Sequence, residues 1–179
     1  MSVLFTLGIF ALLAFWGMGV SKRLIRLRRQ VMNAWTQVDV HLKRRHDLVP
    51  DLVNTVKGAM EFEEGTLEAV ISARDRAAAA TGIAGAGRKE GELTRALSRF
   101  FALAESHPQL AANTSVRALR DELTGTADKI GLARQIYNDI ATKYNAATEV
   151  FPGNIMAGLF GYRQAELFEV AEPAEHAAQ

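Results

Sequence analysis

The four histidines are the first candidates for chemistry, because imidazole is a common metal ligand and proton carrier. They lie at positions 41, 46, 107 and 176. His41 and His46 are five residues apart, which places them about 140° apart around a helix rather than on one edge. The sequence contains neither His-Glu-x-x-His nor Glu-x-x-His. Hydrogen-bonded or solvated histidines are therefore expected, with no metal site and no cofactor.

An acidic cluster follows, in which carboxylates could act as a general acid and base. Its members are Glu61, Glu63, Glu64 and Glu68. Negative charge is also favourable near the N-terminus of a helix, and this simpler role is the preferred interpretation. The nearby sequence GIAGAG lacks the Gly-Lys-Ser/Thr ending of a phosphate-binding loop. No motif pairs a nucleophile with a base, so no catalytic residue is predicted and the protein is expected not to be an enzyme.

Several polar side chains interrupt otherwise apolar helix faces: Arg45, Asp47, Arg74, Arg134, Asn138 and Asn145. An unpaired buried charge is costly, so these residues should find partners. We predict that polar groups around residues 137–145 satisfy Arg45 and thereby fix the register of two helices. A polar pocket that binds a ligand is the alternative.

Composition excludes other classes of protein. The chain has 179 residues and no cysteine, so disulfides, thiolate metal sites and cysteine nucleophiles are impossible. Its net charge of +1 conceals five positive charges within eight residues, which we call the basic collar: Lys22, Arg23, Arg26, Arg28 and Arg29. Residues 30–179 hold 16 basic and 20 acidic side chains, and such an acidic body does not suit nucleic acid.

The elements that must position these residues begin with an uncharged segment at residues 3–20, VLFTLGIFALLAFWGMGV. A helix of this length rises roughly 27 Å, about the thickness of the bilayer hydrocarbon. A transmembrane anchor is predicted in preference to a cleaved signal peptide or a core helix, because the positive charge follows the apolar run and no Ala-x-Ala site is clear. The positive-inside rule places the collar and the remaining chain in the cytoplasm.

Apolar residues at seven-residue spacing predict two long helices. The first has stripes at Leu24, Val31, Val38 and Leu52, and at Trp35, Leu42, Val49 and Val56. The last carries Val116, Leu123, Ile130, Tyr137, Tyr144 and Phe151. Pro50 predicts a kink rather than a break, because the register continues through it. Two stripes of similar length indicate an antiparallel hairpin-like core.

Shorter elements are expected between the two long helices. Helices are predicted at residues 66–80 and 92–105, with the glycine-rich residues 81–91 as a flexible tip. Asn113 is a predicted N-cap, and Pro152-Gly153 should stop the last helix. An apolar patch follows at Ile155, Met156, Leu159, Phe160 and Tyr162. This patch could contact a partner, the bundle or the membrane interface.

The predicted fold is therefore all-α, with an N-terminal transmembrane helix that continues into a coiled-coil-like antiparallel bundle of about four long helices. The expected domains are the anchor at residues 1–21, the helical bundle at residues 22–152, and a short apolar segment with a flexible tail at residues 153–179.

Several blocks of sequence together resemble the LemA family of membrane-anchored bacterial helical proteins. They are RRHDLVPDLVNTVKG at 44–58, TLEAVISARDRA at 66–77, HPQLAAN at 107–113, ELTGTADKIGLARQIYNDIATKYN at 122–145, and FP at 151–152. The chain departs from the family pattern at His107, where tyrosine is usual, and at Ala127, where glutamate is usual. Residues 113–116 also lack the usual acidic and aromatic residues.

The resemblance implies an anchored bundle of long helices with no established activity, cofactor or catalytic residue. Some members of the family are associated with magnetosome membrane formation, and others occur beside HtpX-type membrane zinc proteases. We therefore expect a non-enzymatic scaffold, single-pass in the bacterial inner membrane, that contacts the lipid bilayer and either self-associates or binds a membrane protein. The alternatives are a regulatory or adaptor subunit of a membrane zinc protease or envelope-stress system and, least favoured, an enzyme acting on lipid or phosphate.

Overall fold

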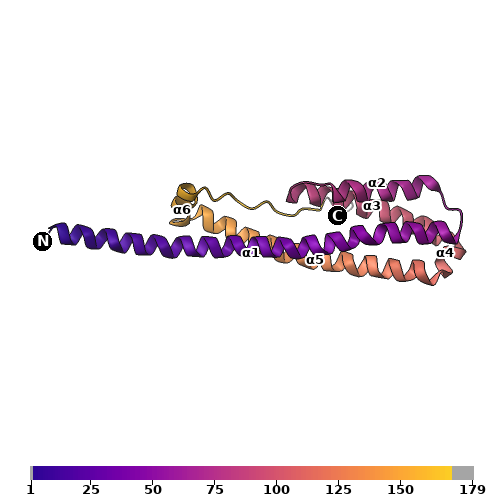
Figure 1. Ribbon diagram of the computed structural model, residues 1–179, viewed down its shortest axis with the longest axis horizontal. Helices are drawn as coiled ribbons and strands as arrows, with labels where there is room; N and C mark the ends of the chain where they lie inside the picture. Colours follow the sequence, from indigo (N-terminus) through magenta and orange to yellow (C-terminus); the bar gives the residue numbers. More distant parts are fainter. Residues whose placement is uncertain (1, 171–179) are drawn as a thin grey trace, which may run out of the picture. The chain divides into compact units, whose positions relative to one another are not determined.

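The computed structural model describes residues 2–170, without the side chains of residues 2–6 and 9–14. The described chain is all-α and contains no strand, which confirms the predicted fold class. Six helices appear among the described residues, where about four were expected (Figure 1). They are α1 (Ser2–Ala59), α2 (Glu64–Ala78), α3 (Ile83–Glu105), α4 (Pro108–Ala112), α5 (Thr114–Glu149) and α6 (Gly153–Phe160).

The predicted transmembrane anchor is not supported by the structure. Among the described residues, no helix is both long enough and apolar enough to cross a membrane. The segment in question forms the start of α1, but most of its side chains lie outside the described residues. His176 and the end of the predicted tail also lie outside them.

The described helices belong to two compact units. Of the described residues, unit 1 contains 2–36 and 135–167, and unit 2 contains 37–134 and 168–170. Helices α1 and α5 contribute residues to both units. The boundaries predicted for the anchor, the bundle and the tail remain predictions.

The core of unit 2 is built from the predicted stripes. Val38, Val49 and Val56 of α1 are fully buried, as is Phe100 of α3. The core cluster joins these helices to α2, α4 and the first part of α5 through Leu67, Leu110 and Leu123 among others. Helix α1 continues through Pro50 without ending, as the unbroken register predicted.

Unit 1 confirms the antiparallel arrangement of the two long helices. Trp35 of α1 packs edge-on against Tyr137 of α5, with ring centroids 5.6 Å apart. Trp16, further back along α1, lies 5.7 Å from Phe151, which follows α5. Positions earlier along α1 therefore contact positions later in the chain around α5, as in an antiparallel pair. Phe151 itself is 65% exposed, contrary to the predicted stripe, because α5 ends at Glu149 and its register no longer applies.

The glycine-rich segment that was predicted as a flexible tip is instead the first part of α3. Gly87 and Gly91 are buried in this helix. A β-carbon at Gly87 would lie 2.1 Å from the backbone oxygen of Glu169, so glycine allows the C-terminal segment to approach closely. The prediction failed because small residues serve close packing as well as flexibility.

The ends of α5 follow the predicted signals. The side-chain oxygen of Asn113 accepts hydrogen bonds from the amides of Ser115 and Val116, at 3.0 and 3.1 Å, which confirms the N-cap. At the other end, α5 stops before Pro152, and α6 starts at Gly153.

An extended segment after α6 is held by α5. Tyr137 and Tyr144 donate hydrogen bonds to the backbone oxygens of Glu166 and Arg163, at 2.6 and 3.0 Å. The amide of Asn145 binds both the amide and the carbonyl of Ala165, at 2.7 and 2.9 Å. These three side chains give residues 162–166 a defined path beside α5.

Candidate functional site

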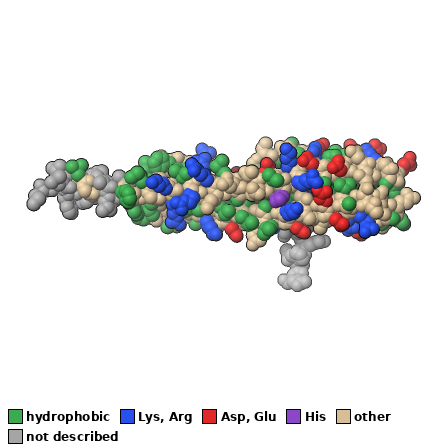
Figure 2. All heavy atoms as spheres, turned by 60° about the horizontal axis from the view of Figure 1, so that its bottom comes forward, with side chains coloured by type: hydrophobic (Ala, Val, Ile, Leu, Met, Phe, Trp, Pro, Cys, Tyr) green, Lys and Arg blue, Asp and Glu red, His purple; other side chains and the backbone are tan. Residues whose placement is uncertain are grey.

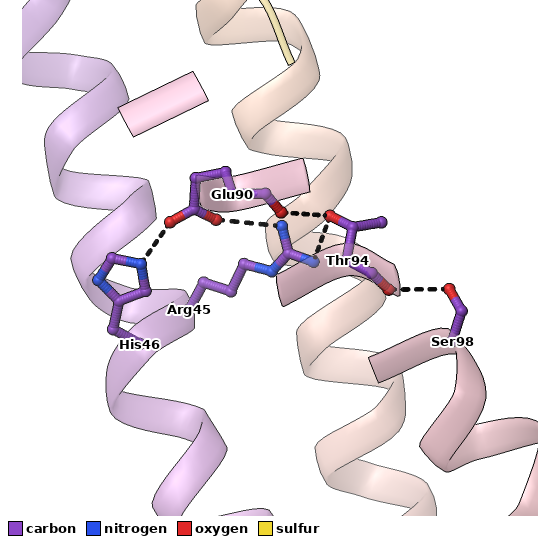
Figure 3. Close-up of polar contacts among 5 residues, drawn as sticks. All are labelled: Arg45, His46, Glu90, Thr94 and Ser98. Carbon is purple, nitrogen blue, oxygen red and sulfur yellow. Dashed lines mark hydrogen bonds and ion pairs between the residues drawn. The ribbon is translucent and has the colours of Figure 1, made fainter. Parts of the chain in front are cut away.

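A buried polar cluster lies in unit 2, between α1 and α3 (Figure 3). Arg45 donates from Nη1 to Oε2 of Glu90 at 3.3 Å and from Nη2 to Oγ1 of Thr94 at 3.0 Å. The other carboxylate oxygen of Glu90 binds Nε2 of His46. The Arg45 and Glu90 residues are only 6% and 1% exposed. One carboxylate therefore joins two neighbouring side chains of α1 to α3.

Burial dominates the electrostatics of Arg45. Removal from water lowers the pKa of its guanidinium below the ordinary value, and the charge and hydrogen bond of Glu90 oppose that shift. Nε of Arg45 is buried without a hydrogen-bond partner among the described residues. The hydrogen bonds of this ion pair thus satisfy most of the polar atoms that it buries, but among the described residues they leave Nε of Arg45 without a partner.

The predicted partner of Arg45 was wrong. Its carboxylate and hydroxyl partners come from α3 rather than from residues 137–145 of α5. Glu90 was missed because it falls within the segment predicted as a flexible tip. The available signal was its spacing from Leu93 and Leu97, since residues three and seven positions apart share a helix face.

The other polar residues are dispersed. Arg74 donates to the backbone oxygen of His46 at 3.1 Å, whereas Asn145 binds the extended C-terminal segment. Asp47 is exposed, and Arg134 and Asn138 are half-buried. A register-fixing role suits the Arg45 cluster, which Arg74 meets at the backbone of His46.

The acidic cluster does not form a paired carboxylate site. Glu61, Glu63, Glu64 and Glu68 are all exposed around the start of α2, and Glu63 occupies its N-cap position. The side chain of Glu63 accepts a hydrogen bond from Thr66. The described residues contain no group of three or more potential acidic, histidine or cysteine ligands that could hold a metal ion.

A second candidate site is an exposed apolar surface on unit 1. Its large side chains are between 46% and 77% exposed and come from α1, the α5–α6 turn and α6: Phe15, Trp16, Met18, Phe151, Ile155, Leu159 and Phe160. We call these residues the apolar surface. Figure 2 shows green hydrophobic side chains gathered over this part of unit 1, at the left of the view. Contiguous exposed apolar residues mark contact sites for proteins or membranes.

Contacts between α1 and α6 assemble this surface. A β-carbon at Gly17 of α1 would lie 3.1 Å from the terminal methyl of Met156, so α6 passes close to α1. Ser21 also donates a hydrogen bond to the sulfur of Met156, at 3.5 Å. The apolar patch predicted after residue 153 thus packs one side chain on α1 and exposes three: Ile155, Leu159 and Phe160.

The basic collar adjoins the apolar surface. All five of its side chains are exposed, and blue Lys and Arg side chains border the green region in Figure 2. The Arg28 guanidinium lies 5.9 Å from the ring centre of Tyr162, just after α6. An apolar surface bordered by cations is chemically suited to an anionic, amphipathic environment.

The fold and these two sites define a class of protein: an all-α chain of long helices with a buried register-fixing ion pair and an apolar contact surface. A model of the LemA family matches residues 34–179, and the chain belongs to that family. The family that the sequence blocks resembled is therefore confirmed.

Similar proteins include magnetosome proteins from two organisms. Magnetosome protein MamQ 1 of Paramagnetospirillum magneticum is 29% identical over 80 residues, which cover 45% of this chain and 29% of the relative. Magnetosome protein MamQ of Magnetospirillum gryphiswaldense is 28% identical over 91 residues, which cover 49% of this chain and 34% of the relative. The matched segments thus span only about a third of these longer relatives.

Proposed function

We propose that the protein is a non-enzymatic, membrane-anchored helical scaffold of the bacterial inner membrane. In this proposal, residues 3–20 enter the bilayer and α6 lies in the interface beside them. The basic collar binds anionic headgroups on the cytoplasmic side. Unit 2 then presents its helices to a second copy or to another membrane protein.

One observation carries this proposal: the apolar surface of unit 1 adjoins the basic collar. Leu159 and Phe160 of α6 are 71% and 63% exposed, and exposed apolar area of this kind is stabilised by lipid. Each collar residue adds about 1 kcal/mol of attraction near an anionic membrane. Membership of the LemA family, with the anchor that the resemblance implied, supports the same interpretation.

The scaffold part of the proposal rests on unit 2. Its core is apolar, and its buried ion pair links α1 to α3 in one register. A unit with fixed helix positions offers a partner the same surface in every copy. Val40 and Leu132 are 55% and 62% exposed and supply apolar contact points on its long helices.

Alkaline extraction of bacterial membranes tests the anchor. The full chain should stay in the membrane pellet at high pH, as integral proteins do. Replacing Leu12 and Leu13 by aspartate places two charges in the apolar segment, and each costs about 3 kcal/mol at the centre of a membrane helix. The double variant should move to the soluble fraction.

A matched control changes an exposed apolar residue outside the segment. Leu132→Asp introduces one charge on α5, where the side chain is already 62% exposed. This variant should stay in the pellet. Release of the unchanged chain by alkali would refute the anchor, as would equal retention of the double variant.

A further inference from the structure

A hollow in unit 1 combines an apolar lining with two cations, and we call it the collar pocket. It has a volume of about 480 Å³ and lies between α1 and the last turns of α5. Arg23 and Lys143 are its charged lining residues, and both are exposed. Its apolar lining includes Val20, Leu24, Val150 and Phe151. The volume falls within the range of small-ligand pockets in proteins, roughly 300–1,000 Å³.

Among the described residues, the cations of the collar pocket have no carboxylate partner. No carboxylate is among the described residues that line the pocket, and neither Arg23 nor Lys143 forms an ion pair with a described residue. The two other hollows differ, because acidic side chains line them beside their arginines. Arg76 pairs with Glu92 in one, and Arg120 pairs with Glu105 in the other. The collar pocket is therefore the one of the three described hollows whose lining holds cations and no carboxylate, and such a lining favours an anion.

The apolar lining favours an anion that carries a hydrocarbon part. Val150 and Phe151 are 64% and 65% exposed, although both are large and apolar. Their exposed area would be removed from water by an aliphatic chain lying in the hollow. A free phosphate would leave this area in contact with water.

The turn that forms one wall of the pocket is closely packed. A β-carbon at Gly153 would lie 1.9 Å from the backbone oxygen of Ala147, and both residues line the hollow. Only glycine lets the chain turn so closely after α5. This wall of the hollow is therefore formed by close backbone packing between the end of α5 and the start of α6.

From these observations we propose that the collar pocket binds one anionic phospholipid, whose phosphate lies against Arg23 and Lys143 and whose acyl chain lies along Val150 and Phe151. This inference rests on the proposed function, because the pocket meets lipid only if residues 3–20 enter the bilayer. Arg23 follows that segment by three positions, which puts the pocket at the depth of the headgroups. The ligand is a membrane lipid rather than a soluble phosphate.

Trp16 provides a direct readout, since its ring lies 5.7 Å from that of Phe151. The chain has two tryptophans, so Trp35→Phe leaves Trp16 as the single fluorophore. The full-length protein in non-ionic detergent micelles is titrated with phosphatidylglycerol whose acyl chains are brominated, since bromine quenches tryptophan on contact. Quenching should saturate at a low lipid fraction, whereas brominated phosphatidylcholine, which reaches Trp16 only from the surrounding micelle, should quench in proportion to its fraction without saturation.

Charge removal tests the two cations. Arg23→Gln with Lys143→Gln should weaken the saturable binding of phosphatidylglycerol by about tenfold or more, because two charge-assisted contacts are lost. Lys57→Gln with Lys129→Gln removes the same charge from exposed positions outside both the pocket lining and the basic collar, and should change the affinity by less than about twofold. Equal effects of the two pairs would overturn the proposal.

A second variant fills the hollow and keeps both cations. Ala146 lines the pocket and is exposed, so Ala146→Phe should block the chain-binding part without burying a new polar group. It should abolish saturable quenching while circular dichroism shows unchanged helix content. If this variant binds phosphatidylglycerol as the parent does, the proposal is wrong even if the charge variants misfold.

Two further outcomes separate this inference from others. Displacement of the lipid by glycerol phosphate at equal concentration would show a phosphate site and overturn the lipid assignment. Alkaline extraction of each variant is measured in parallel. A chain that stays in the membrane but binds phosphatidylglycerol and phosphatidylcholine alike would refute the pocket and leave the proposed function standing.

Discussion

The pair formed by Arg45 and Glu90 illustrates what a buried charge does in this fold. Both side chains are almost completely removed from water, and Glu90 also binds His46. Replacing such a pair by apolar residues is often neutral, whereas removal of one partner leaves a charge without compensation. The pair is therefore better understood as a device that selects one register of α1 against α3 than as a large source of stability.

Glu90→Gln should lower the free energy of unfolding by about 3 kcal/mol, because Arg45 would stay buried without its counter-charge. Urea unfolding of the full chain, followed by circular dichroism, measures this change. Glu122→Gln breaks an exposed ion pair with Arg44 and should have little effect. The double variant Arg45→Met and Glu90→Met should be more stable than Glu90→Gln. A Glu90→Gln variant as stable as Glu122→Gln would contradict this account.

Tyr137 gives a prediction in the alkaline range. Burial raises the pKa of its phenol to about 12, and the nearby Glu166 adds to the shift. The ordinary value in an unfolded chain is about 10. Because the folded pKa is the higher one, this stabilising contribution is complete below pH ~10 and is lost as the pH rises from ~10 to ~12.

Ultraviolet titration of the phenolate tests this assignment. Subtracting the curve of Tyr137→Phe from that of the parent should leave a single transition centred near pH 12. Unfolding measured across the same range should depend less on pH in the variant. A difference curve centred near pH 10 would show that Tyr137 is in contact with water.

At the scale of elements, α6 is placed by close packing at two glycines, Gly153 and Gly17. The glycine at position 153 allows the chain to turn closely after α5, and the helix then lies against Gly17 of α1. Gly158, in the same short helix, has no atom within 4 Å of a β-carbon built on it. The two glycines thus form a matched pair for testing how α6 is held.

Gly153→Ala should destabilise unit 1 by about 1–3 kcal/mol, because the new methyl group overlaps the backbone of Ala147. Gly158→Ala should be neutral or stabilising by up to about 1 kcal/mol, since alanine favours the helix. Thermal unfolding, together with hydrogen exchange of the α6 amides, gives both values. If the two variants unfold alike, the close turn does not hold α6 in place.

The sequence predicted the long helices well and the short contacts poorly. Heptad spacing identified buried positions such as Val38 and Tyr137, because periodic apolar residues must face a core. It could not identify the partner of Arg45, since pairing across helices depends on which helix lies alongside. It also misassigned the glycine-rich start of α3, where small residues allow close packing instead of flexibility. The prediction that Phe151 lies in the buried stripe failed for a related reason: α5 ends at Glu149, and heptad spacing predicts nothing beyond the end of a helix.

At the scale of the whole chain, the two units carry features that suit different kinds of contact. Unit 1 carries an exposed apolar surface, a basic collar and a pocket with two cations. Unit 2 carries an apolar core with a register-fixing ion pair. The first set of features suits contact with lipid, and the second suits constant surfaces for protein contact. The proposed function depends on contact between unit 1 and a bilayer.

The depth of α6 in a membrane tests this central claim most directly. The chain lacks cysteine, so Leu159→Cys and Ala102→Cys each provide a single site for a spin label without further changes. Both positions are exposed, and Ala102 lies on α3 of unit 2. The labelled full-length proteins are placed in vesicles of phosphatidylglycerol and phosphatidylcholine, and power saturation is measured with oxygen and with a water-soluble nickel chelate.

The account predicts that the label at position 159 is relaxed mainly by oxygen, which concentrates in lipid, and that the label at position 102 is relaxed mainly by the nickel chelate. Equal access of the nickel chelate to both labels would contradict it, because α6 would then face water and not the membrane.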